Sequence, residues 1–224
     1  MNTLAWCLSQ SAGVYGIPVM AVIMLLSVSS QPRRSWRARL SGILMAGGVL
    51  LLMLGLVSLV NEHVVKPGFH IFRPNILQLA SNPPEQPALK ISAAAFYAMP
   101  DKLERSEYLA GVMNAADYNG PKLQPLVKQH WIEETGYSFP SGHTTAAMAL
   151  ASYFLALALG RFSGRQLIPY LMLPLWALMV AWSRTVLQVH TPMDVLAGGA
   201  IRLVVGLLAW QFTVRLQLAR ERAE

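Results

Sequence analysis

The sequence predicts an all-α fold, a polytopic bundle of about five membrane-spanning helices. Two observations predict it. The chain of 224 residues is 54% hydrophobic and only 13% charged, whereas a soluble domain usually carries about 25% charged residues. Its apolar residues also gather into runs of roughly the 20 residues that a helix needs to cross a bilayer. We therefore expect residues 1–224 to form a single integral membrane domain, with 61–140 as an extramembrane or interfacial insertion.

Five apolar runs predict the spans: Ala12–Ser30, Leu40–Val60, Thr144–Gly160, Gln166–Ser183 and Val195–Val214. Only the last is interrupted by a charge, at Arg202. The first run lacks a basic flank before it and a small-residue cleavage site after it, so we interpret it as a retained span and not a signal peptide. Between the second and third runs we expect short outer-face helices, some of them lying on the membrane surface.

The orientation follows from the short basic segments, because such segments stay on the cytoplasmic side. They are Arg33, Arg34, Arg37 and Arg39; Arg161 and Arg165; and Arg215, Arg220 and Arg222. This predicts a multi-pass protein of a bacterial inner membrane, with its C-terminus in the cytoplasm and residues 61–140 in the periplasm. The net charge of +7 sits beside apolar runs and not along one polar face, which favours membrane lipids over nucleic acid as partners. No obligatory protein partner is evident, and the single Cys7 excludes an intrachain disulfide.

Three polar clusters stand at the predicted outer ends of the spans. Lys66 and Arg73-Pro74 follow the second span, and Pro140-Ser141-Gly142-His143 opens the third. Ser183-Arg184, His190 and Asp194 connect the fourth span to the fifth. Charges near a bilayer are costly unless they pair or function, so this convergence predicts a site on the outer face.

The cations and the start of the third span suit a phosphate ligand. Lys66, Arg73 and Arg184 are fixed positive charges, and the arginine fork matches phosphate oxygens. Ser141 occupies the expected N-cap, so the first amides of the following helix point at any anion placed there.

The two histidines and the aspartate suit phosphoryl transfer. His190 can attack phosphorus when Asp194 holds its other ring nitrogen, and His143 can give a proton to the leaving oxygen. A cage of cations and amides can stabilise the charge on the transferred group without a metal. We therefore expect no metal and no other cofactor.

Structural interpretations compete with these roles. Ser141 alone can be a simple N-cap, and Thr191 with Asp194 can form a capping box. His63, His70 and His130 fit interfacial or hydrogen-bonded loop positions. Three clusters in one order on one membrane face nevertheless favour a catalytic site.

The three clusters resemble the signature of the type 2 phosphatidic acid phosphatase superfamily, over about Asn61 to the C-terminus. They read Lys66-x6-Arg73-Pro74, Pro140-Ser141-Gly142-His143 and Ser183-Arg184-x5-His190-x3-Asp194. The resemblance implies His190 as nucleophile, Asp194 as its orienting partner and His143 as acid. It also implies that the remaining signature residues bind the phosphate, namely Lys66, Arg73, Ser141, Gly142 and Arg184. Members of this type commonly have six spans, whereas five are counted here.

The resemblance implies a lipid phosphatase that forms a phosphohistidine. The stretch from His130 to His143 is similar to that of bacterial members that act on phosphatidylglycerophosphate and undecaprenyl diphosphate, and phosphatidic acid belongs to the same substrate class. A lipid A phosphatase or phosphotransferase would use the same residues. A lipid-phosphate binding or transport protein that lost catalysis is a more remote alternative, because binding alone needs neither an acid nor a nucleophile.

For three charged residues near the site, the sequence allows more than one role. Arg202 can line the substrate cavity, pair with a carboxylate, bind a headgroup or contact backbone carbonyls inside the bundle. Glu133 and Glu134 can hold a cation of the site or remain solvated.

Overall fold

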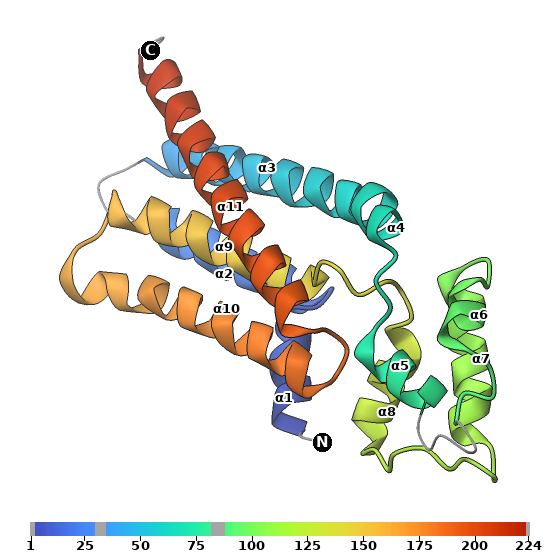
Figure 1. Ribbon diagram of the computed structural model, residues 1–224. Helices are drawn as coiled ribbons and strands as arrows, with labels where there is room; N and C mark the ends of the chain where they lie inside the picture. The colour runs from blue at the N-terminus through green and yellow to red at the C-terminus, as the bar shows by residue number, and fades with distance from the viewer. Residues whose placement is uncertain (1–2, 30–34, 82–87, 223–224) are drawn as a thin grey trace.

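The structure, a computed structural model, describes residues 3–29, 35–81 and 88–222, and within these ranges every regular element is a helix (Figure 1). Four helical segments are long and apolar enough to cross a membrane, namely Trp36–Ser81, Gly142–Leu159, Gly164–Val186 and Pro192–Arg220. The chain is therefore a multi-pass membrane protein with the predicted all-α fold.

The long helices match four of the five predicted spans. They are α3 (Trp36–Val60), α9 (Gly142–Leu159), α10 (Ile168–Val186) and α11 (Pro192–Glu221). The predicted first span, Ala12–Ser30, corresponds to α2 (Gly16–Ser29), which follows α1 (Thr3–Gln10) and a turn; Ser30 lies outside the described residues. The 14 residues of α2 extend only about 21 Å, less than the ~30 Å hydrocarbon thickness.

Helix α9 lies at the centre of the bundle and packs against α2, α3, α10 and α11 (Figure 1). Its alanine-rich sequence allows this close packing, and its buried side chains form the main apolar core. Gly206 of α11 faces α9 so closely that a Cβ there would clash with Ser152 and the Ala149 carbonyl. Small residues at such a contact let two membrane helices approach each other.

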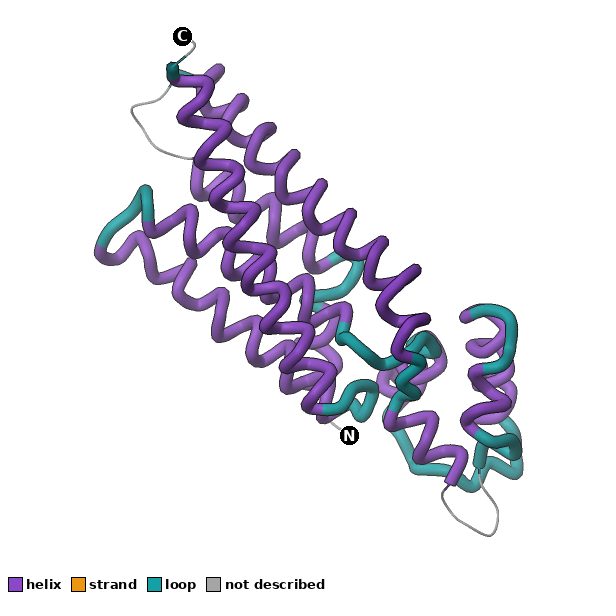
Figure 2. Tube along the Cα trace, turned by 45° about the horizontal axis from the view of Figure 1, so that its top comes forward, coloured by secondary structure: helices purple, strands orange, loops and turns teal. Residues whose placement is uncertain are grey.

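The segment between α3 and α9 forms a separate group of short helices at one end of the bundle, as predicted (Figure 2). After a π-helical turn at Asn61–Val65 come α4 (Lys66–Phe69), α5 (Pro74–Ser81), α6 (Ala93–Tyr97), α7 (Lys102–Asn114) and α8 (Pro125–Glu133). They enclose a second apolar core that includes Trp131, Leu187 and Val189. Because Leu187 and Val189 belong to the α10–α11 connection, this core fixes the short helices onto the bundle.

We call the bundle end beside these short helices the insertion end and the opposite end the C-terminal end. Figure 1 shows the C-terminus, the start of α3 and the α9–α10 connection at the C-terminal end. The predicted basic segments fall there, although Arg33 and Arg34 lie outside the described residues. The first described residues of α1 lie at the insertion end.

Candidate active site

All three polar clusters lie at the insertion end. Lys66 opens α4, Arg73 precedes α5, Ser141 and His143 begin α9, Arg184 ends α10, and His190 and Asp194 lead into α11. One cavity of about 450 Å³ is lined by Lys66, Arg73, Gly142, His143 and His190, among others. The remaining predicted residues, Ser141, Arg184 and Asp194, lie buried around it.

His190 is held by a serine as well as by the predicted aspartate. Its Nδ1 is 3.8 Å from Asp194 Oδ2, which is longer than a hydrogen bond. Ser138 Oγ lies between them, 3.3 Å from Nδ1, and donates to Asp194 Oδ2 at 2.5 Å. The orienting contact therefore runs from His190 through Ser138 to Asp194, which replaces the expected direct bond.

The contacts of His190 also fix its tautomer. Its Nε2 is 3.3 Å from Arg73 Nη1, and because a guanidinium can only donate, Nε2 accepts. The ring proton then belongs on Nδ1, facing Ser138. Burial, together with the positive charge of Arg73, lowers the pKa of His190 to about 3, so the imidazole is neutral at physiological pH. The one in-plane lone pair of the ring is then on Nε2, where it accepts from Arg73, and His190 lines the cavity.

The two arginines are both buried and held by several partners. Arg73 Nε donates to the Gly136 carbonyl at 2.7 Å. Arg184 Nη1 contacts Ser9 Oγ, and it also lies 2.9 Å from His130 Nε2. These contacts fix each guanidinium before any ligand arrives.

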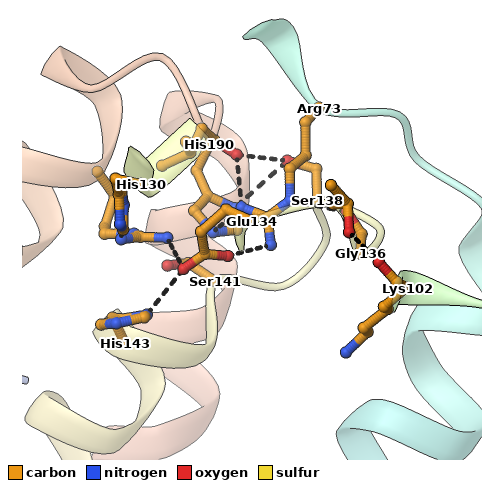
Figure 3. A network of polar contacts seen from close by, with 12 residues as sticks. Arg73, Lys102, His130, Glu134, Gly136, Ser138, Ser141, His143 and His190 are labelled. Atoms are coloured by element: carbon orange, nitrogen blue, oxygen red, sulfur yellow. Dashed lines mark hydrogen bonds and ion pairs between the residues drawn. The ribbon is translucent and has the colours of Figure 1, made fainter. Parts of the chain in front are cut away.

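Glu134 links the two arginines and marks the centre of the site (Figure 3). Its Oε2 is 2.7 Å from Arg73 Nη2, and its Oε1 is 2.8 Å from Arg184 Nη2 and 3.7 Å from His143 Nδ1. Burial opposes ionisation, but Arg73 and Arg184 outweigh it and hold the pKa of Glu134 well below its usual value. One small oxyanion thus bridges both guanidinium groups within reach of His143, which is the arrangement that a phosphate needs.

The start of α9 leaves its amides available. Ser141 occupies the N-cap position but makes no side-chain cap bond, and its hydroxyl instead accepts from Thr144 Oγ1 at 3.1 Å. His143 stands in the first turn, with its ring 6.5 Å from that of His130 in an edge-on arrangement. The free amide end of α9 and His143 therefore border the same space.

Lys66 lies on the opposite wall and has its own partner. Its Nζ pairs with Glu62, whose other oxygen binds Lys102 at 2.5 Å. Two lysines thus share one carboxylate beside the cavity. Among the described residues, no group of three His, Cys, Asp or Glu side chains gathers as a metal site would require.

The structure distinguishes between the roles considered for Glu133, Glu134 and Asp194. Glu134 is the carboxylate of the site, whereas Glu133 is exposed and accepts from Gln129. Asp194 both forms the capping box with Thr191 and faces His190, so the two interpretations hold together.

Sequence reasoning missed Ser9 and Ser138 and ranked His130 as a loop residue. His130 is buried on α8, and burial followed by the charge of Arg184 lowers its pKa to about 4, so it accepts from Arg184 as a neutral ring. The four-residue spacing of His130 and Glu134 at the end of a helix was the available signal, whereas Ser9 had none.

Several known proteins are similar to this chain. A solved structure of a transmembrane PAP2 type phosphatidylglycerolphosphate phosphatase from Bacillus subtilis aligns with a TM-score of 0.45 and 17% identity, covering 95% of this chain and 86% of that chain. Phosphatidylglycerophosphatase B of Escherichia coli K12 is 33% identical over 88 residues, 39% of this chain and 31% of the relative. The Haemophilus influenzae protein of that name is 40% identical over 84 residues, 36% of this chain and 32% of the relative.

These matched segments cover about a third of each of the two relatives. The family comparison extends further, because the model of the PAP2 superfamily matches residues 46–218. That range contains all three polar clusters, α9 and α10, and most of α3 and α11. The chain belongs to the PAP2 superfamily.

Proposed function

We propose that this protein is a membrane lipid phosphatase that hydrolyses a phosphomonoester or diphosphate on a lipid through a phosphohistidine on His190. The substrates it fits are of the phosphatidylglycerophosphate, undecaprenyl diphosphate and phosphatidic acid class. One observation carries the proposal: Arg73 and Arg184 share a single oxyanion, the Glu134 carboxylate, next to a cavity bordered by both histidines.

The cavity suits a substrate with one charged and one apolar end. Away from the arginines it is lined by Ile17 and Pro18 of α2, Leu54 of α3 and Ala146 of α9. Val14, which also lines it, is 82% exposed, so the cavity reaches the molecular surface there. An acyl or prenyl chain can therefore stay among the helices and the lipid, which avoids exposing methylene groups worth about 0.8 kcal/mol each to water.

In the first step, the phosphate takes the place of the Glu134 carboxylate between the two guanidinium groups. His190 Nε2 attacks phosphorus in line, and the bond from phosphorus to the lipid oxygen breaks. His143 gives its proton to that oxygen, which leaves as an alcohol or a lipid phosphate. Ser138 and Asp194 stabilise the positive charge that develops on the His190 ring.

In the second step, water attacks the phosphohistidine. His143, now neutral, takes a proton from the water, and the bond between phosphorus and Nε2 breaks to release inorganic phosphate. The arginines and the amides at the start of α9 hold the equatorial oxygens through both steps. All of these groups belong to this chain, so the proposed chemistry needs no metal.

The basic C-terminal end supports a cytoplasmic position for the C-terminus, which puts the insertion end and the site on the outer face of a bacterial inner membrane. We further propose that residues 1–224 act as one domain, with 61–140 outside the bilayer. The insertion helices border the cavity through Lys102 and Glu134 without filling it.

The test is phosphate release from purified protein over a panel of lipid phosphates in EDTA. We expect release from lipids of the proposed class, together with an acid-labile, base-stable phosphoprotein after rapid quenching with ³²P-labelled substrate. A phosphorylated lipid acceptor in place of free phosphate would indicate a phosphotransferase. The mechanism would be contradicted if the protein were inactive in EDTA and regained activity with a divalent metal, after controls for lipid aggregation.

A further inference from the structure

Arg202 is a buried arginine that the proposed mechanism does not use. It lies in α11, eight residues beyond Asp194, and only 7% of it is exposed. It lines the same cavity as His143 and His190. A charged side chain inside a membrane span is rare and points to a function when it faces a cavity.

The contacts of Arg202 leave much of its hydrogen-bonding capacity unused. Its Nη2 donates to the Val57 carbonyl of α3 at 3.2 Å, so the backbone contact considered from the sequence exists. Its Nε is buried without a partner, and within residues 3–29, 35–81 and 88–222 no carboxylate forms an ion pair with it. Arg73 and Arg184, in contrast, share the Glu134 carboxylate. Arg202 is therefore a cation whose counter-charge must come from elsewhere.

Asn61 provides a second unsatisfied group on the same cavity. It is 4% exposed, lines the cavity, and its Oδ1 has no partner among the described residues. It begins the π-helical turn after α3, one turn beyond Val57. A buried polar atom without a partner is costly. Arg202 Nε donates and Asn61 Oδ1 accepts, so these two atoms on one cavity indicate a ligand with both an acceptor group and a donor group.

The position of Arg202 determines the distance between the reacting phosphate and a ligand group bound to Arg202. Eight residues along a helix separate its Cα from that of Asp194 by about 12 Å. Helical side chains lean toward the N-terminus of their helix, so the guanidinium lies closer to the catalytic histidines than its Cα does. A group that binds here is thus deeper in the bundle than the reacting phosphate.

We propose that Arg202 forms a second anion subsite that binds an inner phosphate of the lipid substrate, while Asn61 Oδ1 accepts from a hydroxyl of the same lipid. This rests on the proposed function and narrows it to lipids with two phosphates. A glycerol link separates two phosphorus atoms by three carbons and two oxygens, whereas a diphosphate joins them through one oxygen. The longer link matches the position of Arg202 better, so the favoured ligand is the phosphodiester of a glycerol-linked lipid bisphosphate.

The experiment compares lipids that differ in their second phosphate. KM is measured for phosphatidylglycerophosphate, a prenyl diphosphate and phosphatidic acid with matched chains, using wild type, Arg202→Gln and Arg202→Lys. Loss of the charged donor should raise KM for phosphatidylglycerophosphate about tenfold or more and change KM for phosphatidic acid by less than about twofold. The KM of Arg202→Lys for phosphatidylglycerophosphate should lie between those of wild type and Arg202→Gln, because lysine keeps the positive charge and loses the planar guanidinium. A larger effect on the prenyl diphosphate would assign the subsite to the inner phosphate of a diphosphate.

Arg161→Gln is the matched control, because Arg161 also donates to a helix carbonyl, that of Leu157, but lies away from this cavity. It should leave all three KM values unchanged. Equal changes for one-phosphate and two-phosphate lipids in the Arg202 variants, or none, would overturn the subsite.

Measurements of lipid binding test this subsite independently of the proposed catalytic function. Dissociation constants for the same lipids are measured with His190→Ala, alone and combined with Arg202→Gln. A selective loss of affinity for the two-phosphate lipid supports the subsite even if the wild-type protein releases no phosphate, which would contradict only the proposed function. Equal affinity losses for both lipids would contradict the subsite.

Discussion

The two ends of the helix bundle carry the same residue type in opposite environments. At the insertion end, Arg73 and Arg184 are 2% and 0% exposed, and Arg73 lines a cavity of about 450 Å³. At the C-terminal end, Arg165 and Arg215 are exposed, and the cavity beside Arg39 and Arg161 holds only about 30 Å³. In the sequence, both ends carry arginines next to apolar runs, and only the motifs around Arg73 and Arg184 set the insertion end apart.

The difference teaches that burial and shared partners, and not the number of charges, distinguish a reactive end from an anchoring end. A buried guanidinium must find hydrogen-bond acceptors, and at the insertion end these are Glu134, His130 and backbone carbonyls. An exposed arginine is solvated and contributes mainly to orientation in the membrane. Substitutions at the two ends should therefore differ by orders of magnitude in their effect on activity.

The largest effect is expected from His190→Ala. The substitution removes the ring nitrogen Nε2, which contacts Arg73 beside the cavity, so turnover should fall about 10⁴-fold or more while the protein stays folded. The rate of phosphate release and the melting temperature, measured on the same purified sample, check this. Substantial activity in well-folded His190→Ala would contradict the nucleophile assignment.

The next effect is expected from Arg184→Gln, which removes a buried cation from the phosphate cage. Loss of one preorganised donor should lower kcat by about 10²–10³-fold. The Glu134 carboxylate would keep only Arg73 as an arginine partner, so the melting temperature should also fall. Steady-state kinetics and thermal unfolding measure both effects. A variant with wild-type kcat would show that the cage functions without this arginine.

Ser138→Ala should have a smaller effect, because it removes the bridge but leaves Asp194 in place. With Nδ1 still 3.8 Å from the carboxylate, the ring is held less firmly, and kcat should fall about tenfold with little change in KM. Ser106→Ala is the matched control, since the Ser106 hydroxyl donates to the Ile132 carbonyl away from the histidines. Equal kcat values for the two variants would remove Ser138 from the site.

Much of the fold and the core of the site could be predicted from the sequence. Spans two to five were correct because uncharged runs of this length have few alternatives to a membrane helix. The predicted first span is a shorter apolar helix in the structure, because Ala12 to Tyr15 belong to the turn before α2. These residues carry no charge, so the apolar run in the sequence continues through the turn.

The predicted site residues converge because each cluster lies next to the end of a long helix. Ser9 and Ser138 reach the site only through tertiary contacts from segments without a motif. No pattern in the sequence distinguishes Ser138 from any other loop serine, so only the folded chain could identify it.

Glu134→Gln tests whether this carboxylate holds the place of the substrate phosphate. Without the negative charge, inorganic phosphate should bind more tightly, with an inhibition constant lower by about five- to tenfold, and it should raise the melting temperature more than in wild type. Glu107→Gln on α7 is the control, because Glu107 is exposed and does not line the cavity, and it should behave like wild type. A weaker inhibition by phosphate in Glu134→Gln would show that Glu134 assists phosphate binding.

The pH dependence of this difference follows from the lowered pKa of Glu134. The carboxylate stays ionised while the pH is above its folded-state pKa, so its ion pairs stabilise the folded protein there and are lost only as the pH falls through that value. The difference in phosphate inhibition between wild type and Glu134→Gln should thus be flat between about pH 5 and pH 8. A difference that disappears near pH 6 would mean that Glu134 is not held by the two arginines.

The smallest effect is expected from Arg165→Gln, the counterpart of Arg184→Gln at the C-terminal end. Arg165 lies exposed in the short helical turn Gly164–Leu167, so its replacement breaks no buried ion pair. Exposed substitutions of this kind change stability by about 0.5 kcal/mol or less, and kcat/KM should change by less than about twofold. The remaining basic residues at that end preserve the orientation, which labelling of single cysteines from either side of the membrane can verify. If Arg165→Gln lowered kcat as much as Arg184→Gln, the two ends would be coupled through the bundle, and burial could no longer explain why one end is reactive and the other is not.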